Sequence, residues 1–417
     1  MSQVLSYSLK PAQARLIRIH VALIPVYGWL LLVWTAYAID ISPAGRLDRS
    51  GHIKGHDFAH FYVLGEIAND HAADQLYSFT RQAERMDRLV PSYENRFAPI
   101  HGPQLSLLFA PLARLPYEMA LIIWLAFTIA GYAACWFWLW RSSPALKPYG
   151  WVAIILAAGF PPFYLLIAFG QNSVLAVACV TAAYFALRAR RPWLAGFALG
   201  MLVYKPAFGL ALPFVLLYGR EWRMVLGATM AVVLQLGVGA LYYGVNSVSR
   251  YVEAVTHVGQ IAGVLEPIPD QMQSLRSFFS VLVPSSDVAF AAYVLSAAVV
   301  IAIAAWCWRS TAALELRYSV LLLATILVDP HVNPYDLVAI IPVLVLVAAW
   351  LISRPAAGWL PWALLYLCYY LPALSYLPAV THVQFSVIAL VALTVVVAGI
   401  IRAENRGVSS QVSSLHA

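Results

Sequence analysis

The chain has 417 residues, of which 62% are hydrophobic and 11% are charged, and its formal net charge is +7. Soluble domains usually carry about 25% charged residues, so the composition excludes an ordinary soluble protein and predicts a polytopic membrane protein. The cysteines all fall inside apolar runs, which argues against a disulfide framework or a CxxC metal site. They are Cys135, Cys179, Cys307 and Cys368.

Apolar runs near the roughly 20 residues needed to cross a bilayer recur along the whole chain. The first run, Ile17 to Ile39, has 23 residues, which is too long for a cleaved signal sequence and predicts a retained span. Residues 193–218 are predicted to form two short helices broken at Lys205-Pro206, which gives about twelve membrane helices in one domain, 1–417. The full spans are predicted at 17–39, 117–140, 150–168, 173–187, 224–245, 288–308, 318–328, 336–352, 357–373 and 383–401.

Basic residues cluster in alternate connections between the spans, and the positive-inside rule then orients the chain. One set of connections holds 15 of the 26 basic residues, with only Glu221, Glu315 and Glu404 on the acidic side. We therefore expect both termini to be cytoplasmic, and we interpret the net positive charge as an orientation signal rather than a nucleic-acid site. The opposite, extracytoplasmic face then carries two large connections, 40–104 and 246–287.

The first large connection carries 16 of the 45 charged residues and five of the ten histidines. Its residues 57–71 predict an amphipathic helix, with Phe58, Phe61 and Tyr62 as the anchor that seats it at the bilayer surface. The following stretch, 105–116, is apolar but short and interrupted by proline, which predicts a segment lying along the membrane or dipping into it.

Polar motifs inside or beside the apolar stretches all fall on this same outer face. Ionisable groups near a bilayer are costly and are functional candidates by default, so their convergence predicts one site. The motifs are Asp57, Gly170-Gln171-Asn172, Lys205-Pro206, the QMQSLR stretch that ends at Arg276, and the group Asp329, His331 and Asp336.

Three interpretations are open for Asp57. As a helix N-cap it would accept a hydrogen bond from a following backbone amide. As a metal ligand it would act with His56 and His60, although a second ligand cluster with defined spacing is missing. As a carboxylate presented at the membrane surface it would act as a general base. Capping and catalysis are compatible with each other.

Lys205 interrupts an apolar run without an acidic residue beside it. It either snorkels to the membrane surface or meets an anionic group, such as a phosphate, where a helix break leaves backbone amides free. Structural roles are also open for the other motifs: a polar turn for Gln171-Asn172, loop positions for Arg276 and His331, and helix caps for Asp329 and Asp336.

A series of motifs runs through the chain in a fixed order. It comprises DFAHFY at 57–62, Leu76-Tyr77, FAPIHGPQLSLLFAPLARLP at 97–116, Trp124, FGQN at 169–172 and AGFALGMLVYKP at 195–206. This series resembles glycosyltransferase family 87, and the resemblance covers about residues 17–350. The resemblance implies the membrane-embedded GT-C fold and an activity like that of the family's mannosyltransferases and arabinofuranosyltransferases, which use polyprenyl-phosphate sugars.

The resemblance also implies roles for individual residues. Asp57 matches an aspartate at the start of a short helix in the family's first outer loop, which implies the catalytic base, and Asp40 is a weaker candidate. Lys205 matches a lysine in a segment rich in small residues, and His331 matches a histidine in a late loop. Around His331, D-P-H-V-N-P-Y-D departs from the commoner S-P-H form, and Q-M-Q-S departs from an N-Q-S element.

From these residues we predict an inverting, polyprenyl-phosphate-sugar-dependent glycosyltransferase. Asp57 would remove a proton from the acceptor hydroxyl, while Lys205, Arg276 and His331 would stabilise the departing phosphate. Residues predicted to contact substrate are His60, Tyr62, Gln171, Asn172, Gln273 and Ser274.

The expected sugar is mannose or a pentofuranose, and the expected acceptor is a lipid or a glycan. The chain would lie in a bacterial cytoplasmic membrane with its site on the periplasmic face. A lipid-phosphate donor needs neither a nucleotide nor a divalent ion to hold a diphosphate, so no cofactor or metal is expected. This fits the lack of a P-loop or Rossmann fingerprint in the sequence.

Two other classes of function compete with this prediction. A lipid or sugar transporter tends to carry structural repeats and midplane polar residues, whereas this sequence shows no convincing repeat and its polar residues favour one face. A non-catalytic protein of envelope assembly would tolerate the loss of Asp57 and Lys205 together.

Overall fold

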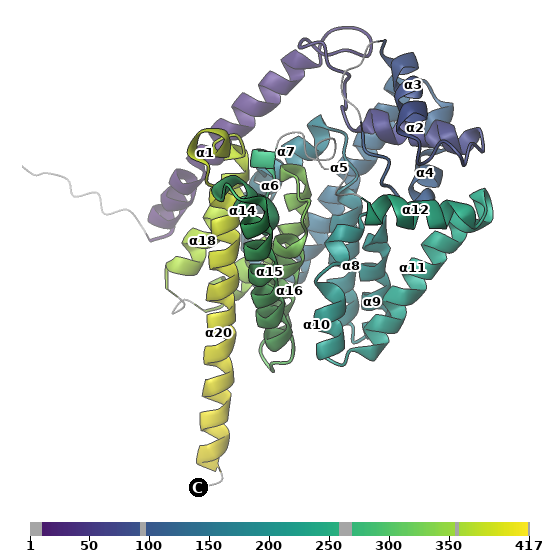
Figure 1. The fold of residues 1–417 in the computed structure, drawn as a ribbon. Helices are drawn as coiled ribbons and strands as arrows, with labels where there is room; N and C mark the ends of the chain where they lie inside the picture. The colour runs from purple at the N-terminus through teal and green to yellow at the C-terminus, as the bar shows by residue number, and fades with distance from the viewer. Residues whose placement is uncertain (1–10, 92–96, 258–268, 355–357, 416–417) are drawn as a thin grey trace, which may run out of the picture.

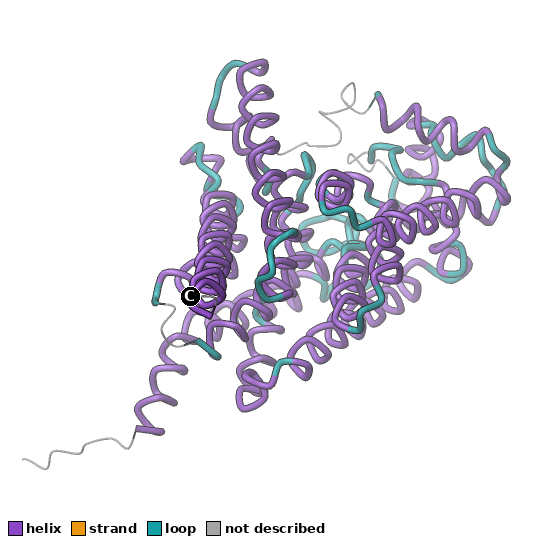
Figure 2. Tube along the Cα trace, turned by 90° about the horizontal axis from the view of Figure 1, so that it is seen from below, coloured by secondary structure: helices purple, strands orange, loops and turns teal. Residues whose placement is uncertain are grey.

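The computed structural model of the chain describes residues 11–91, 97–257, 269–354 and 358–415 (Figure 1). Every regular element in these residues is a helix, and the β-type pairing is limited to an isolated bridge between Leu47 and Ile53 (Figure 2). The prediction of an all-α fold is therefore confirmed for the described part of the chain. Lys10, parts of the connections 40–104 and 246–287, and residue 357 at the start of a predicted span lie outside it.

Among the described residues, six apolar helices are long enough to cross a membrane. The hydrocarbon of a membrane offers no hydrogen bonds to the backbone, whereas a helix pairs its own N–H and C=O groups. Long apolar runs therefore form helices. The six are α1 (Pro11–Asp40), α5 (Tyr117–Ser142), α11 (Trp222–Tyr243), α15 (Ser286–Trp308), η7 (Pro334–Ile340) continued by α17 (Ile341–Ile352), and α20 (Phe385–Leu415).

One further apolar stretch consists of two helices that meet at a bend. The 3-10 helix η2 (Pro144–Tyr149) and α6 (Gly150–Ala158) are followed by α7 (Pro161–Ala168) at an angle of 46°. Pro161 and Pro162 lie in the first turn of α7, where a missing N–H is tolerated, and they prevent α6 from continuing through. The stretch predicted as one span at 150–168 is thus a broken pair.

Shorter helices complete the bundle, and one of their breaks was predicted. The chain turns at Lys205, whose φ of −126° and ψ of 81° are not helical, because a residue before proline is driven out of the α region. The predicted count of about twelve membrane helices stays a prediction. These helices are α8 (Val174–Arg188), α9 (Pro192–Gly200) with η3 (Met201–Tyr204), η4 (Pro206–Gly209) with α10 (Leu212–Tyr218), α16 (Leu314–Val328), and α18 (Leu360–Tyr370) with η9 (Leu371–Leu374).

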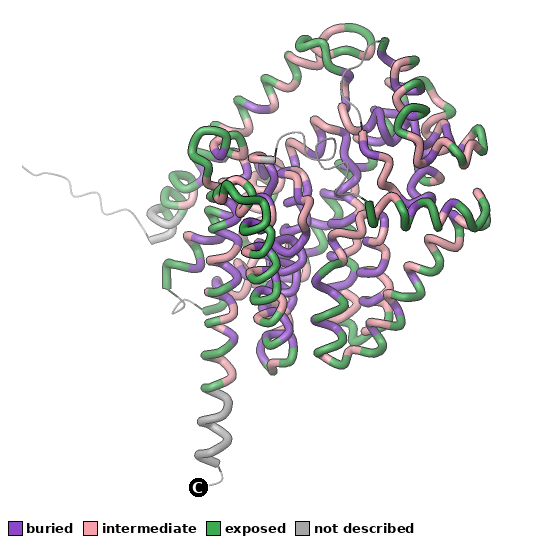
Figure 3. Tube along the Cα trace, in the orientation of Figure 1, coloured by how far each residue is buried: buried purple, intermediate pink, exposed green. Residues whose placement is uncertain are grey.

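Small helices between the longer ones gather at one end of the bundle, whereas the C-terminus lies at the other end (Figure 1). α16 and α17 form the buried centre, and α1 lies at the periphery (Figure 3). The small helices are α2 (Phe58–Asn69), α3 (Phe79–Leu89), α4 (Pro103–Phe109), η1 (Leu112–Arg114), α12 (Asn246–Thr256), η6 (Pro269–Gln271), α14 (Leu275–Leu282) and α19 (Pro378–Thr381).

The prediction that aromatic residues of α2 anchor it at the bilayer surface is wrong. Phe58 and Phe61 are almost fully buried, and Phe61 stacks on Phe109 of α4 with ring centroids 4.9 Å apart. Tyr62 donates a hydrogen bond to the backbone oxygen of Leu115 at 2.8 Å. Since α4 and the start of α5 cover the apolar face of α2, this helix is held inside the protein.

Candidate active site

The backbone of Asp57 is docked against the end of α7. The amide of Asp57 donates a hydrogen bond to the Phe169 oxygen at 3.0 Å, and the amide of Phe58 reaches the same oxygen at 3.2 Å. Gly170 follows with a φ of +61°, a left-handed conformation that glycine adopts without strain. The turn between α7 and α8 therefore positions the start of α2.

The Asp57 carboxylate does not cap α2. Its conformation is helical and its side chain accepts no capping hydrogen bond, so the N-cap interpretation is wrong. Instead, Oδ2 accepts a hydrogen bond from Nε2 of Gln171 at 2.7 Å. The Tyr335 hydroxyl also hydrogen-bonds the carboxylate, and this hydroxyl accepts from Gln171 Nε2 at 3.0 Å. Two side chains from distant segments thus fix the carboxylate.

Burial dominates the electrostatics of Asp57. It raises the pKa of this carboxyl to about 6, against the opposing effects of the Gln171 hydrogen bond and the positive charge of Lys205. At neutral pH the group is still mainly ionised. It is a stronger base than an exposed aspartate, which suits it to accept a proton.

Lys205 forms a buried ion pair at the break between η3 and η4. Its Nζ lies 2.6 Å from Oδ1 of Asp336 and 2.9 Å from Oγ of Ser173, and Ser173 also donates to Asp336. The same ammonium lies 5.4 Å from the ring centroid of Tyr335, within the range of a cation–π contact. The sequence shows no acidic residue near Lys205, but the fold supplies one.

Asp336 has a second role, which was predicted. It occupies the third position of η7 in a capping box with Asn333, and its Oδ2 accepts from the Asn333 amide at 3.1 Å. Asp329 ends α16, and its Oδ1 accepts from the His331 amide at 2.7 Å. Burial raises the pKa of Asp329 to about 7, and the hydrogen bond from the His331 backbone opposes this effect. Both aspartates therefore stabilise the chain around His331.

The QMQS stretch packs on the loop that carries His331. The Gln273 amide donates to the Val332 oxygen at 2.7 Å, and the Ser274 hydroxyl donates to the Pro330 oxygen at 3.2 Å. Ser274 also caps α14, whose first turn carries Arg276. The side chains of Gln273 and Ser274 are buried and bonded within the protein, so their observed contacts are structural.

Two histidines pack together at α2, and one of them was not singled out in the sequence. His60, one turn beyond Asp57, is buried with its ring 4.9 Å from Phe97 and 5.2 Å from His101. Burial lowers the pKa of His60 to about 3, which leaves it neutral. The pKa of His101 is lowered by burial, by His60, and by the charges of Lys205 and His331. His101 therefore packs against α2, with its ring 5.6 Å from that of Phe61.

Two further predicted residues, Asn172 and His56, make contacts of their own. Asn172 is fully buried, and its backbone oxygen accepts from the Tyr204 hydroxyl at 3.3 Å. His56 turns its ring toward His52 and Phe169. In the described ranges, no three His, Cys, Asp or Glu side chains are arranged to hold a metal, so the interpretation of His56, Asp57 and His60 as ligands lacks support.

The structure brings Asp57, Gln171, Lys205 and the His331 loop together, as the convergence of motifs predicts. It adds Ser173, Tyr335, Asp336 and His101. Ser173 directly follows the GQN motif, and Tyr335-Asp336 ends the VDPHVNPYD stretch, so these residues lay inside or next to motifs already singled out. The group thus combines a half-buried carboxylate with a largely buried ammonium that is paired with Asp336.

Comparison with known proteins adds one finding. A family model described as glycosyltransferase family 87 matches residues 100–330, more than half of the chain. The matched part includes Gln171 and Lys205, whereas Asp57 and Asp336 lie outside it. No curated protein and no solved structure matches the chain.

Proposed function

Since the chain belongs to glycosyltransferase family 87, we propose that it is a membrane glycosyltransferase that takes a sugar from a polyprenyl-phosphate donor. The observation that carries this proposal is the arrangement around Asp57. The half-buried carboxylate is held by Gln171 and Tyr335, and the positive charge of Lys205 acts on it. This arrangement supports a site that combines a base with a cation for the donor phosphate.

The reaction is a single displacement at the anomeric carbon. The oxygen of an acceptor hydroxyl forms a bond to this carbon, and the bond from the carbon to the phosphate oxygen breaks. Asp57 takes the hydroxyl proton, and the polyprenyl phosphate leaves with the bonding electrons from the opposite side of the sugar. The configuration at the anomeric carbon is therefore inverted.

The leaving phosphate needs charge stabilisation more than it needs a proton. Lys205 has three N–H bonds, and Asp336 and Ser173 occupy two of them. The third is the one we assign to a phosphate oxygen. Because Asp336 neutralises much of the charge on Lys205, we assign the remaining stabilisation of the phosphate to Arg276 and His331. This donor requires neither a metal nor a nucleotide.

The sugar is a mannose or a pentofuranose, and the acceptor is a lipid or a glycan. The proposed location is a bacterial cytoplasmic membrane, and the distribution of basic residues supports cytoplasmic termini and a site that faces the periplasm. The single domain 1–417 would then act as one catalytic unit.

The decisive experiment replaces Asp57 with asparagine, which keeps the size of the side chain and removes the base. Purified Asp57→Asn protein with donor and acceptor should lose turnover by about 10²- to 10⁴-fold, the range of general-base catalysis, and still bind donor. Asp40→Asn, the weaker candidate for the base, is the matched control and should keep its activity. Near-normal turnover in Asp57→Asn would show that the base is wrongly assigned.

A further inference from the structure

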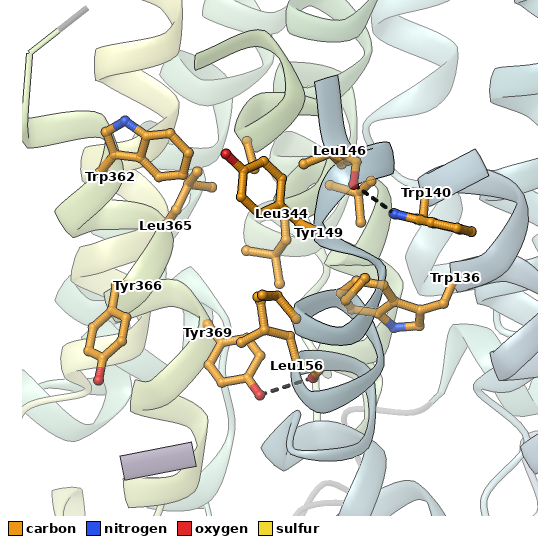
Figure 4. A pocket seen from close by; sticks show the side chains of 14 residues that line it. Trp136, Trp140, Leu146, Tyr149, Leu156, Leu344, Trp362, Leu365, Tyr366 and Tyr369 are labelled. Carbon is orange, nitrogen blue, oxygen red and sulfur yellow. Dashed lines mark hydrogen bonds between the residues drawn. The ribbon is translucent and has the colours of Figure 1, made fainter. Parts of the chain in front are cut away.

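A cavity of about 220 Å³ lies between five helical elements, η2, α5, α6, α17 and α18 (Figure 4). It is larger than an apolar cavity of about 150 Å³ that binds benzene in another protein. Aromatic and aliphatic side chains line it, among them Trp136, Trp140, Leu156, Leu344, Trp362 and Tyr366.

The surface that lines the cavity is almost entirely apolar, although Nε1 of Trp136 has no hydrogen-bond partner in the structure. Nε1 of Trp140 donates to the Leu146 oxygen at 2.9 Å, and the Tyr369 hydroxyl donates to the Leu156 oxygen at 3.0 Å (Figure 4). These polar groups are therefore occupied within the protein, and mainly carbon faces the cavity. A saccharide would lose its hydrogen bonds to water there, whereas a hydrocarbon chain would not.

The cavity is separate from the site around Asp57. Trp124 of α5 donates to the Gly170 oxygen at 2.9 Å, next to Gln171. Trp136 lies 12 residues further along the same helix, which is about 18 Å at the rise of an α-helix. Trp362 and Tyr366 are 41% and 43% exposed, so the cavity opens through α18 to the side of the bundle, where a membrane protein meets lipid.

Two basic residues are neighbours in the sequence of residues that line the cavity. Arg141 and Lys147 are exposed, and they flank Trp140, Leu146 and Tyr149 in the sequence. The stretch 141–150 contains no acidic residue. Tryptophan and tyrosine mark the level of lipid headgroups in membrane proteins, and basic residues at that level attract anionic headgroups.

We propose that this cavity binds one acyl chain of an anionic glycerophospholipid, whose headgroup lies against Arg141 and Lys147. The apolar walls select a hydrocarbon chain, the side opening admits it from the bilayer, and the two cations select the negative headgroup. The polyprenyl-phosphate donor is a different lipid, because its phosphate is assigned to Lys205 at the other end of α5.

The test uses the full-length protein reconstituted in nanodiscs with equal amounts of phosphatidylglycerol and phosphatidylcholine. Native mass spectrometry of the released protein identifies the lipids that stay bound. Ala348→Phe on α17 and Ala153→Phe on α6 each fill the cavity. Ala302→Phe, on the exposed side of α15, is the matched control.

The wild-type protein should retain phosphatidylglycerol in preference to phosphatidylcholine. Both filling variants should retain about tenfold less, the effect of displacing roughly two methylene groups, and Ala302→Phe should match the wild type. The variant R141E/K147E should lose the preference for phosphatidylglycerol, and it gives a second measurement if filled cavities impair folding.

Three results would overturn the proposal. The filling variants could melt at the wild-type temperature and retain as much phosphatidylglycerol as the wild type. The wild type could bind both phospholipids equally. Finally, after polyprenyl phosphate is added to the nanodiscs, the wild type could retain that lipid alone, and the two filling variants could fail to retain it.

Discussion

Lys205 and Asp336 form a buried ion pair, with Nζ of the lysine 2.6 Å from Oδ1 of the aspartate, although 131 residues separate them in the chain. Their side chains are only 15% and 2% exposed. Removing one partner of such a pair leaves the other charge uncompensated in a medium of low dielectric constant, which costs about 3–5 kcal/mol.

Lys205→Met and Asp336→Asn should therefore each destabilise the protein, and the double variant should lose less stability than the sum of the two. Unfolding in detergent, followed by heat or denaturant, measures the coupling. Strictly additive losses would show that the pair does not stabilise the fold.

The same double variant separates structure from donor binding. Lys205→Met with Asp336→Asn restores the balance of charge, but it lacks the ammonium assigned to the donor phosphate. We expect recovered stability together with donor binding at least about tenfold weaker than in the wild type, the loss of one charge-assisted hydrogen bond. Titration with a polyprenyl-phosphate sugar measures this affinity. Wild-type affinity in a stable double variant would remove Lys205 from the donor site.

The pH dependence of turnover should report Asp57. Burial raises the pKa of this carboxyl from 3.8 to about 6, and the base acts only when it is ionised. The value of kcat/KM should therefore fall about tenfold for each pH unit below pH 6. An exposed aspartate would keep the rate level down to about pH 4. A rate profile with no decline between pH 6 and pH 4.5 would contradict the assignment.

Tyr335→Phe should shift this acidic limb. The change removes a hydroxyl that hydrogen-bonds the Asp57 carboxylate, so the charged form loses a donor and its pKa rises further. The shift should be about one pH unit, since a hydrogen bond to a charged group contributes about 1.5–3 kcal/mol and part is recovered by water. Tyr204→Phe is the matched control, because its buried hydroxyl contacts Asn172 instead. Equal shifts in the two variants would indicate a general disturbance of the site.

Gly170→Ala should impair the enzyme through the position of α2. Residue 170 has a φ of +61°, and an added Cβ would lie 2.7 Å from Cβ of Phe58. We expect a loss of stability of at least about 1–2 kcal/mol, the usual cost of the left-handed conformation, and lower turnover because Asp57 is displaced. Gly209→Ala meets no atom within 4 Å and should be neutral. A fully active Gly170→Ala enzyme would show that the α7–α8 turn does not position the base.

Much of the helical fold was predictable, because long apolar runs leave the backbone one main solution in a membrane. The break at Lys205-Pro206 followed from the local effect of proline on the residue before it. The proximity of Gln171 to Asp57 was predictable because the positive-inside rule assigned both residues to the same, extracytoplasmic face. Local rules and face assignment were sufficient for these features.

Features that depend on tertiary packing were not predictable. The periodicity of residues 57–71 showed that α2 has an apolar face, but protein and lipid cover such a face equally well. Only the fold shows that α4 and α5 provide the cover. Likewise, Asp336, the acidic partner of Lys205, is distant from it in the sequence. A helix-capping role was already a sufficient local explanation for an aspartate at position 336. Its second contact required the three-dimensional structure.

The distance between Lys205 and Asp336 along the chain also has a consequence for biosynthesis. At roughly 5–20 residues per second, the ribosome adds the 131 residues that separate them in roughly 7 to 26 s. During that interval the lysine is part of the nascent chain, but its counter-ion has not yet been synthesised. The nascent chain therefore has to keep this ammonium hydrated or in contact with lipid headgroups until α16 and η7 arrive, and the positive charge enters its final position only as the last third of the protein is inserted.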